Sequence, residues 1–506
     1  MATHPKRPPG TVYLVGAGPG DPELVTLRAV ECLRQADVIL YDYLVNPEIL
    51  VHAAGEAERI CLGRHGQGRI WTQTEIHQQM IDAAQAGRTV VRLKGGDPAV
   101  FARATEEIEA LESAGIPLEI VPGITAALAA SSFAGIPVTH RQLASAVALV
   151  TGHEESGKPS SRVDYAALAK FPGTLVIYMG VTTAPDWTSE LLKAGKSPDT
   201  PVAIIRRCSW PDQIIVRCQL SELAELLQTP RKLRPPIIVI IGEVAQLPSA
   251  TSWFEERPLF GQRILITRPA DQATPLRQRL TSLGANVFVQ PAIAIHPPDD
   301  WDEVDKVIER LCDFDWLVFS SANGVRFFLQ RLSDLGHDLR RLGHTQLACI
   351  GPSTANELRR FHLRCDLIPD EYRAEALAES LSKEVSDKRV LLLRASRGRE
   401  VLAERLQQVA AEVKQVVVYC STDLETPDRQ IADHIAAGRF DWVTVTSSAI
   451  ARSLVALFGE DLQKARLASI SPVTSNTLRE LHIEPTAEAA DYTIDGMVKA
   501  ILQAED

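Results

Sequence analysis

The stretch TVYLVGAGPGDPELVTLRAVECLRQADVILYD, residues 11–42, decides the fold class. TVYLVG is a mostly apolar run that leads into glycines, ELVTLRAVECLRQA has apolar residues at helical spacing, and DVILYD is a second apolar run. The pattern predicts a strand, a helix and a strand. Strands that alternate with helices predict an α/β fold with a mainly parallel sheet, whose ligands lie beyond the carboxyl ends of the strands.

The same alternation continues through the first half of the chain. EIHQQMIDAAQAG (75–87) has helical spacing, and TVVRLKGGD (89–97) is a further apolar run that ends in glycines. Turns of small residues also follow the runs near 121–127 and 175–180. Because glycine lets the backbone approach a ligand closely, these turns predict a pocket lined by backbone groups. Such a pocket suits an adenosyl ligand.

The first turn, Gly16 to Pro22, has two other interpretations. One is a dinucleotide fingerprint with Asp42 as the ribose ligand, which requires the helix to begin inside the glycine run. Pro19 and Pro22 interrupt that run, and Pro22 disfavours a helical Asp21. The other interpretation is a plain turn from strand to helix.

Length and charge limit the function. A chain of 506 residues predicts about three or four domains. Its formal net charge of −11 disfavours nucleic acid and anionic membrane as partners, so an anionic substrate must meet local arginines and lysines. No stretch reaches the length of a membrane span. The eight cysteines form no CxxC pair and no His cluster accompanies them, which predicts reduced thiols, a cytoplasmic protein and no metal site.

The second half contains a duplication. RILITR at 263 matches RVLLLR at 389, and FDWLVFSSANGV at 314 matches FDWVTVTSSAIA at 440, both offset by 126 residues. ACIGPSTANELR at 348 matches ASISPVTSNTLR at 468, offset by 120. We expect two similar α/β lobes with a cleft between them. Residues 1–10 are expected to be a disordered tail, and the Pro-containing segment 248–262 is expected to be a linker.

Six segments of the first half together resemble the tetrapyrrole methylase family, and within it the uroporphyrinogen-III C-methyltransferases. They are VGAGPGDPELVTLRA, ADVILYDYLV, RLKGGDPAVF, VPGITAALAASSFAGIPVTHR, TLVIYMG and PVAIIRR, and the likeness spans residues 11–247. The resemblance implies two lobes, 11–124 and 125–247, with S-adenosyl-L-methionine between them and S-adenosyl-L-homocysteine as its product. It implies these cofactor-binding residues: Pro19, Gly95, Gly96, Asp97, Val100, Thr125, Ala126 and Met179.

The same resemblance places Asp42 where the family has its candidate general base. Methyl transfer to a pyrrole carbon requires loss of a proton, which a carboxylate can accept. The alternative role for Asp42 is capping a strand end. The substrate implied is a macrocycle with eight carboxylates, for which Arg64 and Arg141 are the expected partners.

Three positions depart from the methylase pattern. Gly63-Arg64-His65 stands where the family has Gly-Lys-Arg, and the permanently charged Arg64 is a poor proton donor. The segment 101–106 lacks the three glycines usual there. Cys208 replaces a glycine, and its side chain is expected to crowd the cofactor.

The second half resembles uroporphyrinogen-III synthase in FDWLVFSSANGVRFF, IGPSTANEL, VVVYCST and YTIDGMVKAI. The resemblance implies flavodoxin-like parallel-sheet lobes, one formed by 263–293 with 421–506 and the other by 294–420. Tyr419 matches the family's candidate proton donor, and its alternative role is core packing. Hydroxyl and amide residues at the strand ends are expected to bind substrate carboxylates or only to cap helices. They are Ser320, Ser321, Asn323, Thr354, Ser448 and Thr474, with Arg268 and Arg394 as charge partners.

Together the two resemblances imply a bifunctional enzyme of tetrapyrrole biosynthesis. The second half would cyclise hydroxymethylbilane to uroporphyrinogen III, and the first half would methylate it at C2 and C7 to give precorrin-2, for sirohaem or cobalamin. The methylase family further implies a homodimer through the first half. Two alternatives stay open, which are a methylase of a later corrin intermediate and a non-catalytic tetrapyrrole-binding protein.

Overall fold

The computed structural model describes residues 9–63, 70–153, 162–228, 233–247, 253–398 and 400–505. The chain divides into two compact units, Met1–Gly261 (unit 1) and Gln262–Asp506 (unit 2). Most of the expected tail, Arg64 and the first part of the expected linker lie outside the described residues. Within the described ranges, no helix is both long and apolar enough to cross a membrane.

The first sheet of unit 1 is parallel throughout. Its strands lie in the order β3-β2-β4-β1-β5, and each pairs in parallel with its neighbour. Their bounds are β1 Val12–Gly16, β2 Val38–Tyr41, β3 Glu58–Cys61, β4 Val90–Lys94 and β5 Leu118–Val121. Because the strands are parallel, the turns that follow β1, β2, β4 and β5 meet at one edge of the sheet.

The second sheet of unit 1 corrects the expectation of mainly parallel pairing. Its order is β6-β7-β10-β8-β9, and only the β6–β7 pair is parallel. The strands are β6 Val147–Thr151, β7 Thr174–Tyr178, β8 Pro201–Arg206, β9 Ile214–Gln219 and β10 Ile237–Ile241. Strands buried on both faces are apolar whichever way they pair, so composition did not reveal the direction.

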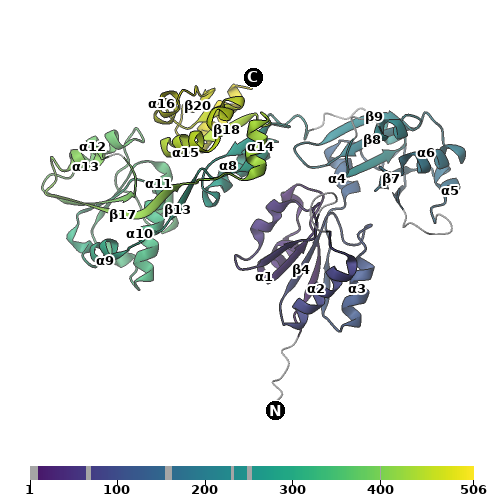
Figure 1. Ribbon diagram of the computed structural model, residues 1–506, viewed down its shortest axis with the longest axis horizontal. Helices are drawn as coiled ribbons and strands as arrows, with labels where there is room; N and C mark the ends of the chain where they lie inside the picture. Colours follow the sequence, from purple (N-terminus) through teal and green to yellow (C-terminus); the bar gives the residue numbers. More distant parts are fainter. Residues whose placement is uncertain are drawn as a thin grey trace, which may run out of the picture. The chain divides into compact units, whose positions relative to one another are not determined.

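Helices cover both faces of the two sheets of unit 1. They are α1 Leu27–Gln35, α2 Gln73–Gln85, α3 Ala104–Ser113, α4 Ala126–Phe133, α5 Tyr165–Ala169, α6 Ala184–Lys193 and α7 Leu223–Gln228. Helix α1 covers one face of the first sheet and α2 and α3 cover the other (Figure 1), and a separate buried apolar cluster lies under each group. The end of the expected linker is packed rather than free, because the Phe254 ring lies 4.7 Å from Phe133 and is 2% exposed.

Unit 2 holds two further sheets. The outer lobe has the order β12-β11-β18-β19-β20, all parallel, which is the flavodoxin order 2-1-3-4-5. The inner lobe has the order β13-β17-β16-β14-β15, parallel except for β13. The outer strands are β11 Arg263–Ile266, β12 Asn286–Val289, β18 Trp442–Val445, β19 Arg466–Ser469 and β20 Ala487–Glu488. The inner strands are β13 Ile293–His296, β14 Trp316–Phe319, β15 Gln346–Cys349, β16 Arg389–Ala395 and β17 Glu412–Asp423.

The duplication is confirmed down to the strand register. Trp316 of β14 lies opposite Val390 of β16, and the matching Trp442 of β18 lies opposite Ile264 of β11. Each pair of matched segments therefore occupies the same place in its own sheet. The inner lobe is inserted into the outer one, and β13 and β17 form the antiparallel connection between them (Figure 1).

The helices of unit 2 follow the same repeat. They are α8 Ala270–Ser282, α9 Asp302–Glu309, α10 Ala322–Asp334, α11 Pro352–Arg360, α12 Ala374–Ser382, α13 Val401–Leu406, α14 Arg429–Ala436, α15 Ser448–Phe458, α16 Pro472–Glu480 and α17 Ile494–Gln503. α10 and α15 begin at matching serines, Ser321 and Ser447, whose hydroxyls accept a first-turn N–H.

Candidate active sites

Three glycine turns of unit 1 pack backbone against backbone at the edge of the first sheet. A Cβ on Gly16 would lie 2.6 Å from the Cα of Gly123 and 2.7 Å from the carbonyl oxygen of Gly96. Gly18 and Gly96 also exchange two backbone hydrogen bonds, of 3.1 and 2.7 Å. Side chains are therefore excluded here for steric reasons, and the turns present backbone groups, as an adenosyl ligand requires.

Asp97 joins two of these turns. Its Oδ1 accepts a hydrogen bond from the N–H of Ala99 at 2.7 Å, and its Oδ2 accepts one from the N–H of Gly123 at 2.9 Å. Both oxygens of the expected cofactor ligand thus already hold the backbone. Asp97 therefore organises the second and third turns, and each of its oxygens can accept a further hydrogen bond.

Tyr178 connects the second lobe of unit 1 to the expected cofactor residues. Its hydroxyl lies 2.6 Å from Oγ1 of Thr125 and accepts the N–H of Ala127 at 2.9 Å. The ring of Phe101, from the first lobe, lies 5.1 Å from the Tyr178 ring. The next residue, Met179, has a left-handed φ of 54° and is 49% exposed. Backbone strain at a non-glycine residue is typical of functional sites.

Asp42 is held by a buried chain of charges. Its Oδ1 accepts a hydrogen bond from Nη2 of Arg92 at 2.7 Å; Nε of Arg92 donates to Glu107 at 3.0 Å, and Nζ of Lys94 donates to the other oxygen of Glu107 at 2.7 Å. The Arg92 and Glu107 side chains are 3% and 0% exposed, whereas Asp42 is 31% exposed. This charge chain thus reaches solvent at Asp42.

The charge chain follows from the strand geometry. Arg92 and Lys94 are two apart on β4, so their side chains leave the same face of the sheet, toward Glu107 on α3. Burial alone would lower the pKa of Arg92, but the carboxylates of Asp42 and Glu107 raise it above its ordinary value. Burial and the neighbouring Arg92 lower the pKa of Lys94.

The remaining residues expected in unit 1 fall into two groups. Pro19, Gly95, Val100 and Ala126 lie in or directly after the turns at the sheet edge. Arg141 is exposed on a loop, and Arg64 lies outside the described residues. Cys208 is 6% exposed and its thiol points to the carbonyl oxygen of Ala126 at 3.8 Å. Burial raises the pKa of the Cys208 thiol to about 12, so the thiol is neutral.

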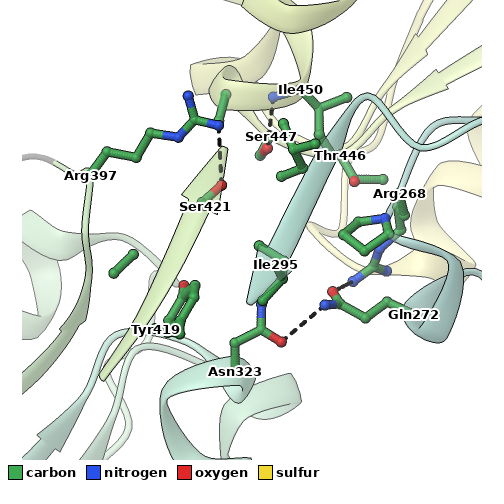
Figure 2. Close-up of a pocket in the computed structure, with 14 residues that line it drawn as sticks. Arg268, Gln272, Ile295, Asn323, Arg397, Tyr419, Ser421, Thr446, Ser447 and Ile450 are labelled. Atoms are coloured by element: carbon green, nitrogen blue, oxygen red, sulfur yellow. Dashed lines mark hydrogen bonds between the residues drawn. The ribbon is translucent and has the colours of Figure 1, made fainter. Parts of the chain in front are cut away.

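A cavity of about 300 Å³ lies between the two lobes of unit 2. Residues of both lobes and of the connecting strands line it, as Figure 2 shows. They are Arg268, Pro269, Gln272, Ile293, Ile295, Asn323, Ala395, Arg397, Tyr419, Ser421, Thr446, Ser447, Ala449 and Ile450. Of the residues expected to bind or react, Arg268, Asn323 and Tyr419 are on this wall, whereas Arg394 is not.

The hydrogen bonds around Tyr419 have a definite direction. The N–H of Gly324 donates to Oγ of Ser321 at 3.1 Å, and Ser321 donates its own proton to the Tyr419 hydroxyl at 3.0 Å. The Tyr419 hydroxyl therefore accepts from Ser321 and keeps its proton for another acceptor. Burial raises the pKa of Tyr419, so the phenol stays protonated at neutral pH.

The other hydroxyl residues expected in unit 2 face elsewhere. Ser320 donates to the carbonyl oxygen of Leu393, and Ser448 accepts from Thr477. Thr354 and Thr474 are 3% and 2% exposed in their own lobes. None of these four belongs to the cavity wall formed by the described residues. None of the four caps a described helix either, because the N-cap residues of α10, α11, α15 and α16 are Ser321, Gly351, Ser447 and Ser471.

Several polar residues of the cavity were not predicted. Gln272 donates to Oδ1 of Asn323 at 3.0 Å and so bridges the two lobes. Arg397 pairs with Asp423 at 2.8 Å and contacts Ser421. The duplication was the available signal, because Thr446 and Ser447 follow β18 as Ser320 and Ser321 follow β14. Among the described residues, no cluster of His, Cys, Asp and Glu side chains is arranged to hold a metal ion.

Two family models match the chain. The tetrapyrrole (corrin/porphyrin) methylases match residues 11–224, and uroporphyrinogen-III synthase HemD matches residues 274–499. The porphyrin biosynthesis protein HemD of Ruminiclostridium josui is 31% identical over 496 residues, which cover 98% of each chain. The chain therefore belongs to the tetrapyrrole methylase family over its first half and to the uroporphyrinogen-III synthase family over its second half.

Further relatives match the first half. The S-adenosyl-L-methionine-dependent uroporphyrinogen III methyltransferase of Methanosarcina barkeri is 47% identical and covers 47% of this chain and 93% of its own. A solved structure of the Thermus thermophilus uroporphyrin-III C-methyl transferase with S-adenyl homocysteine is 43% identical, with a TM-score of 0.40, and covers 47% of this chain and 94% of its own. The two family models and the Methanosarcina barkeri relative confirm the expected enzyme class and the expected cofactor, S-adenosyl-L-methionine, at the level of the family.

Proposed function

We propose that this chain is a bifunctional enzyme that cyclises hydroxymethylbilane to uroporphyrinogen III in unit 2 and methylates that product at C2 and C7 in unit 1. The product would be precorrin-2, which supplies sirohaem or cobalamin. What carries the proposal is the directed hydrogen-bond chain that leaves the Tyr419 proton free at a cavity in a synthase domain.

The residues of unit 1 suit a methyl transfer followed by loss of a proton. The turns around Gly16, Gly96 and Gly123 would hold S-adenosyl-L-methionine by backbone groups, with Thr125 and Met179 beside it. When bound, this cofactor supplies the methyl group and leaves as S-adenosyl-L-homocysteine. The methylated carbon has no hydrogen of its own, so Asp42 would accept the proton that the ring system loses at another position. Arg92 fixes the direction of that carboxylate, and a cationic methylated ring loses its proton to even a weak base.

The residues of unit 2 suit loss of a hydroxyl and ring closure. The Tyr419 phenol would protonate the leaving hydroxyl of the bilane, so that the carbon–oxygen bond breaks and water departs. The resulting cation reacts within the same molecule. The main work of the protein is then to hold the open chain in the shape that inverts the last ring, which the cavity between the lobes allows.

The test supplies the purified full chain with hydroxymethylbilane and labelled S-adenosyl-L-methionine and identifies the pigment. We expect a type III macrocycle that carries two labelled methyl groups. A type III macrocycle without label would remove the methylase half of the proposal. In a parallel assay with a corrin substrate, label found only there would favour a later methylation. If the chain neither cyclises the bilane nor transfers methyl groups, a non-catalytic tetrapyrrole-binding protein is the remaining interpretation.

We also propose that the chain forms a homodimer through unit 1 and acts in the cytoplasm. The support is the match to the methylase family, whose members commonly pair. Light scattering on unit 1 alone and on the full chain would test the dimer. A monomeric full chain would contradict it.

A further inference from the structure

Arg268 is a cation at the cavity without a carboxylate partner. It lies between β11 and α8, and its guanidinium contacts Oε1 of Gln272 at 3.5 Å, a weak hydrogen bond (Figure 2). Arg268 takes part in none of the ion pairs found among the residues that the structure describes. The adjacent carboxylate, Asp271, instead pairs with Arg326 at 2.9 Å. Burial lowers the pKa of Arg268, and the charge of the nearby Asp271 offsets only part of that shift.

The duplication supplies a matched comparison. Arg394 occupies the same place in RVLLLR as Arg268 does in RILITR. Arg394 contacts Glu400 and lies 3.0 Å from Oε1 of Gln415, so its charge is compensated. Charged groups withdrawn from water are normally paired, because an unpaired one destabilises the fold. The same arginine is therefore paired in the inner lobe and left unpaired in the outer lobe.

The wall around Arg268 combines groups that attract an anion with an apolar surface. Three helices begin at this wall: Pro269 precedes α8, Asn323 lies in the first turn of α10, and Ser447 precedes α15. The first-turn N–H groups carry partial positive charge and lack acceptors within their helix. Ile293, Ile295 and Ile450 form the apolar part of the wall. An anion attached to a ring system satisfies both parts.

We propose that Arg268 binds one carboxylate side chain of the bilane and anchors the open chain across the cavity beside Tyr419. The proposal rests on the proposed function of unit 2 and makes Arg268 a binding residue. Once bound, the carboxylate of the substrate compensates the charge of Arg268, which no ion pair within the described protein compensates. Arg397, whose charge Asp423 already compensates, has no comparable need for a substrate anion.

The experiment compares Arg268→Gln with the unmodified full chain. We expect the KM for hydroxymethylbilane to rise about 10- to 100-fold, the loss of one charge-assisted hydrogen bond, while kcat changes less. Fluorescence titration with uroporphyrin III, a stable octacarboxylate, should show a loss of affinity of the same size. Binding of uroporphyrin III to unit 1 is common to all variants and cancels in the comparison. Its methyl ester should bind both proteins alike.

Thermal unfolding separates binding from a structural role. Removal of an uncompensated cation should leave Tm unchanged or raise it, whereas Arg394→Gln, which breaks a compensated pair, should lower Tm. Arg279→Gln, at an exposed position of the same helix α8, is the control and should change neither the KM for hydroxymethylbilane nor Tm. Arg268→Lys keeps the positive charge but lacks the planar guanidinium, so its KM for hydroxymethylbilane should lie between those of the wild type and Arg268→Gln.

The outcomes distinguish this proposal from the proposed function. Unchanged KM and affinity in Arg268→Gln, together with a lower Tm, would overturn the anchor and make Arg268 a structural residue. If the unmodified chain makes no type III macrocycle, the proposed activity of unit 2 fails. In that case a loss of uroporphyrin III affinity in Arg268→Gln would still support the carboxylate site.

Discussion

In unit 1, Arg92, Glu107 and Lys94 are buried and pair with one another and with Asp42, whereas in unit 2 Arg268 faces a cavity and forms no ion pair with any described residue, because the nearby Asp271 pairs with Arg326. The first arrangement is complete without a ligand and fixes a carboxylate in one direction. The second is incomplete until an anion arrives. The difference predicts that mutations in the charge chain of unit 1 lower stability as well as turnover. Mutations at the cavity of unit 2 should mainly change substrate binding and turnover, with little effect on stability.

Of the variants considered, Asp42→Asn should cause the largest loss of activity. Asparagine can still accept a hydrogen bond from Arg92 but cannot take a proton, so methyl transfer to uroporphyrinogen III should slow by about 10²- to 10⁴-fold. Cofactor binding, measured by calorimetry, should be unchanged. Glu31→Gln, an exposed carboxylate of α1, is the control. Retained turnover in Asp42→Asn would reduce Asp42 to a strand-end residue.

Arg92→Met should break the closed arrangement itself. It leaves Glu107 with only Lys94 and Asp42 with no partner, so the free energy of unfolding of unit 1 should fall by about 3–5 kcal/mol. Arg28→Met, which breaks the exposed pair with Glu119, should cost no more than about 1 kcal/mol. Chemical denaturation of both variants measures the difference. Equal losses would show that burial of the charge chain contributes nothing.

Tyr419→Phe tests the open site. Loss of the phenol proton should lower kcat for ring closure by about 10²-fold without a comparable change in Tm. Because burial raises the pKa of Tyr419, the wild-type rate should stay level through neutral pH and fall only above the ordinary tyrosine value of about 10. Tyr372→Phe, at an exposed tyrosine of the same lobe, is the control. If the wild-type rate already declines with rising pH before pH 8 is reached, the proton donor is a group other than Tyr419.

Ser321→Ala should have the smallest effect. It removes the hydrogen bond that orients Tyr419 and the cap of α10, so kcat should fall about 3- to 10-fold and stability by about 1 kcal/mol. Ser471→Ala removes a cap of the same kind from α16 and should cost the stability alone. If both variants lower kcat equally, the direction of the hydrogen-bond chain has no role in the reaction.

The fold was predictable where a pattern repeats. The matched strands of unit 2 and the alternation of residues 11–97 gave strands and helices in the right order, because buried faces impose a period on the sequence. The pairing direction of β7 to β10 was not predictable, since a central strand is apolar in either direction. The duplication predicted two similar lobes, and the structure adds that Trp316 and Trp442 have matching strand partners.

The candidate sites were predictable only in part. Tyr419 and Asp42 came from family motifs that the sequence displays. The charge chain behind Asp42 was not visible, because Arg92, Lys94 and Glu107 have the composition of a solvated surface until the fold brings β4 and α3 together. Thr354 and Thr474 have the same motif positions as the other hydroxyls, but only packing decides which hydroxyls reach a cavity.

The insertion of one lobe of unit 2 inside the other orders events at the ribosome. Strands β11 and β12 are the first of unit 2 to emerge, yet β18, the partner of β11, is synthesised only after β13 to β17. The inner lobe can complete its sheet from one continuous stretch of chain, as domains do when they fold in order of synthesis. The outer lobe has to wait, so its first two strands spend the longest time exposed to wrong partners.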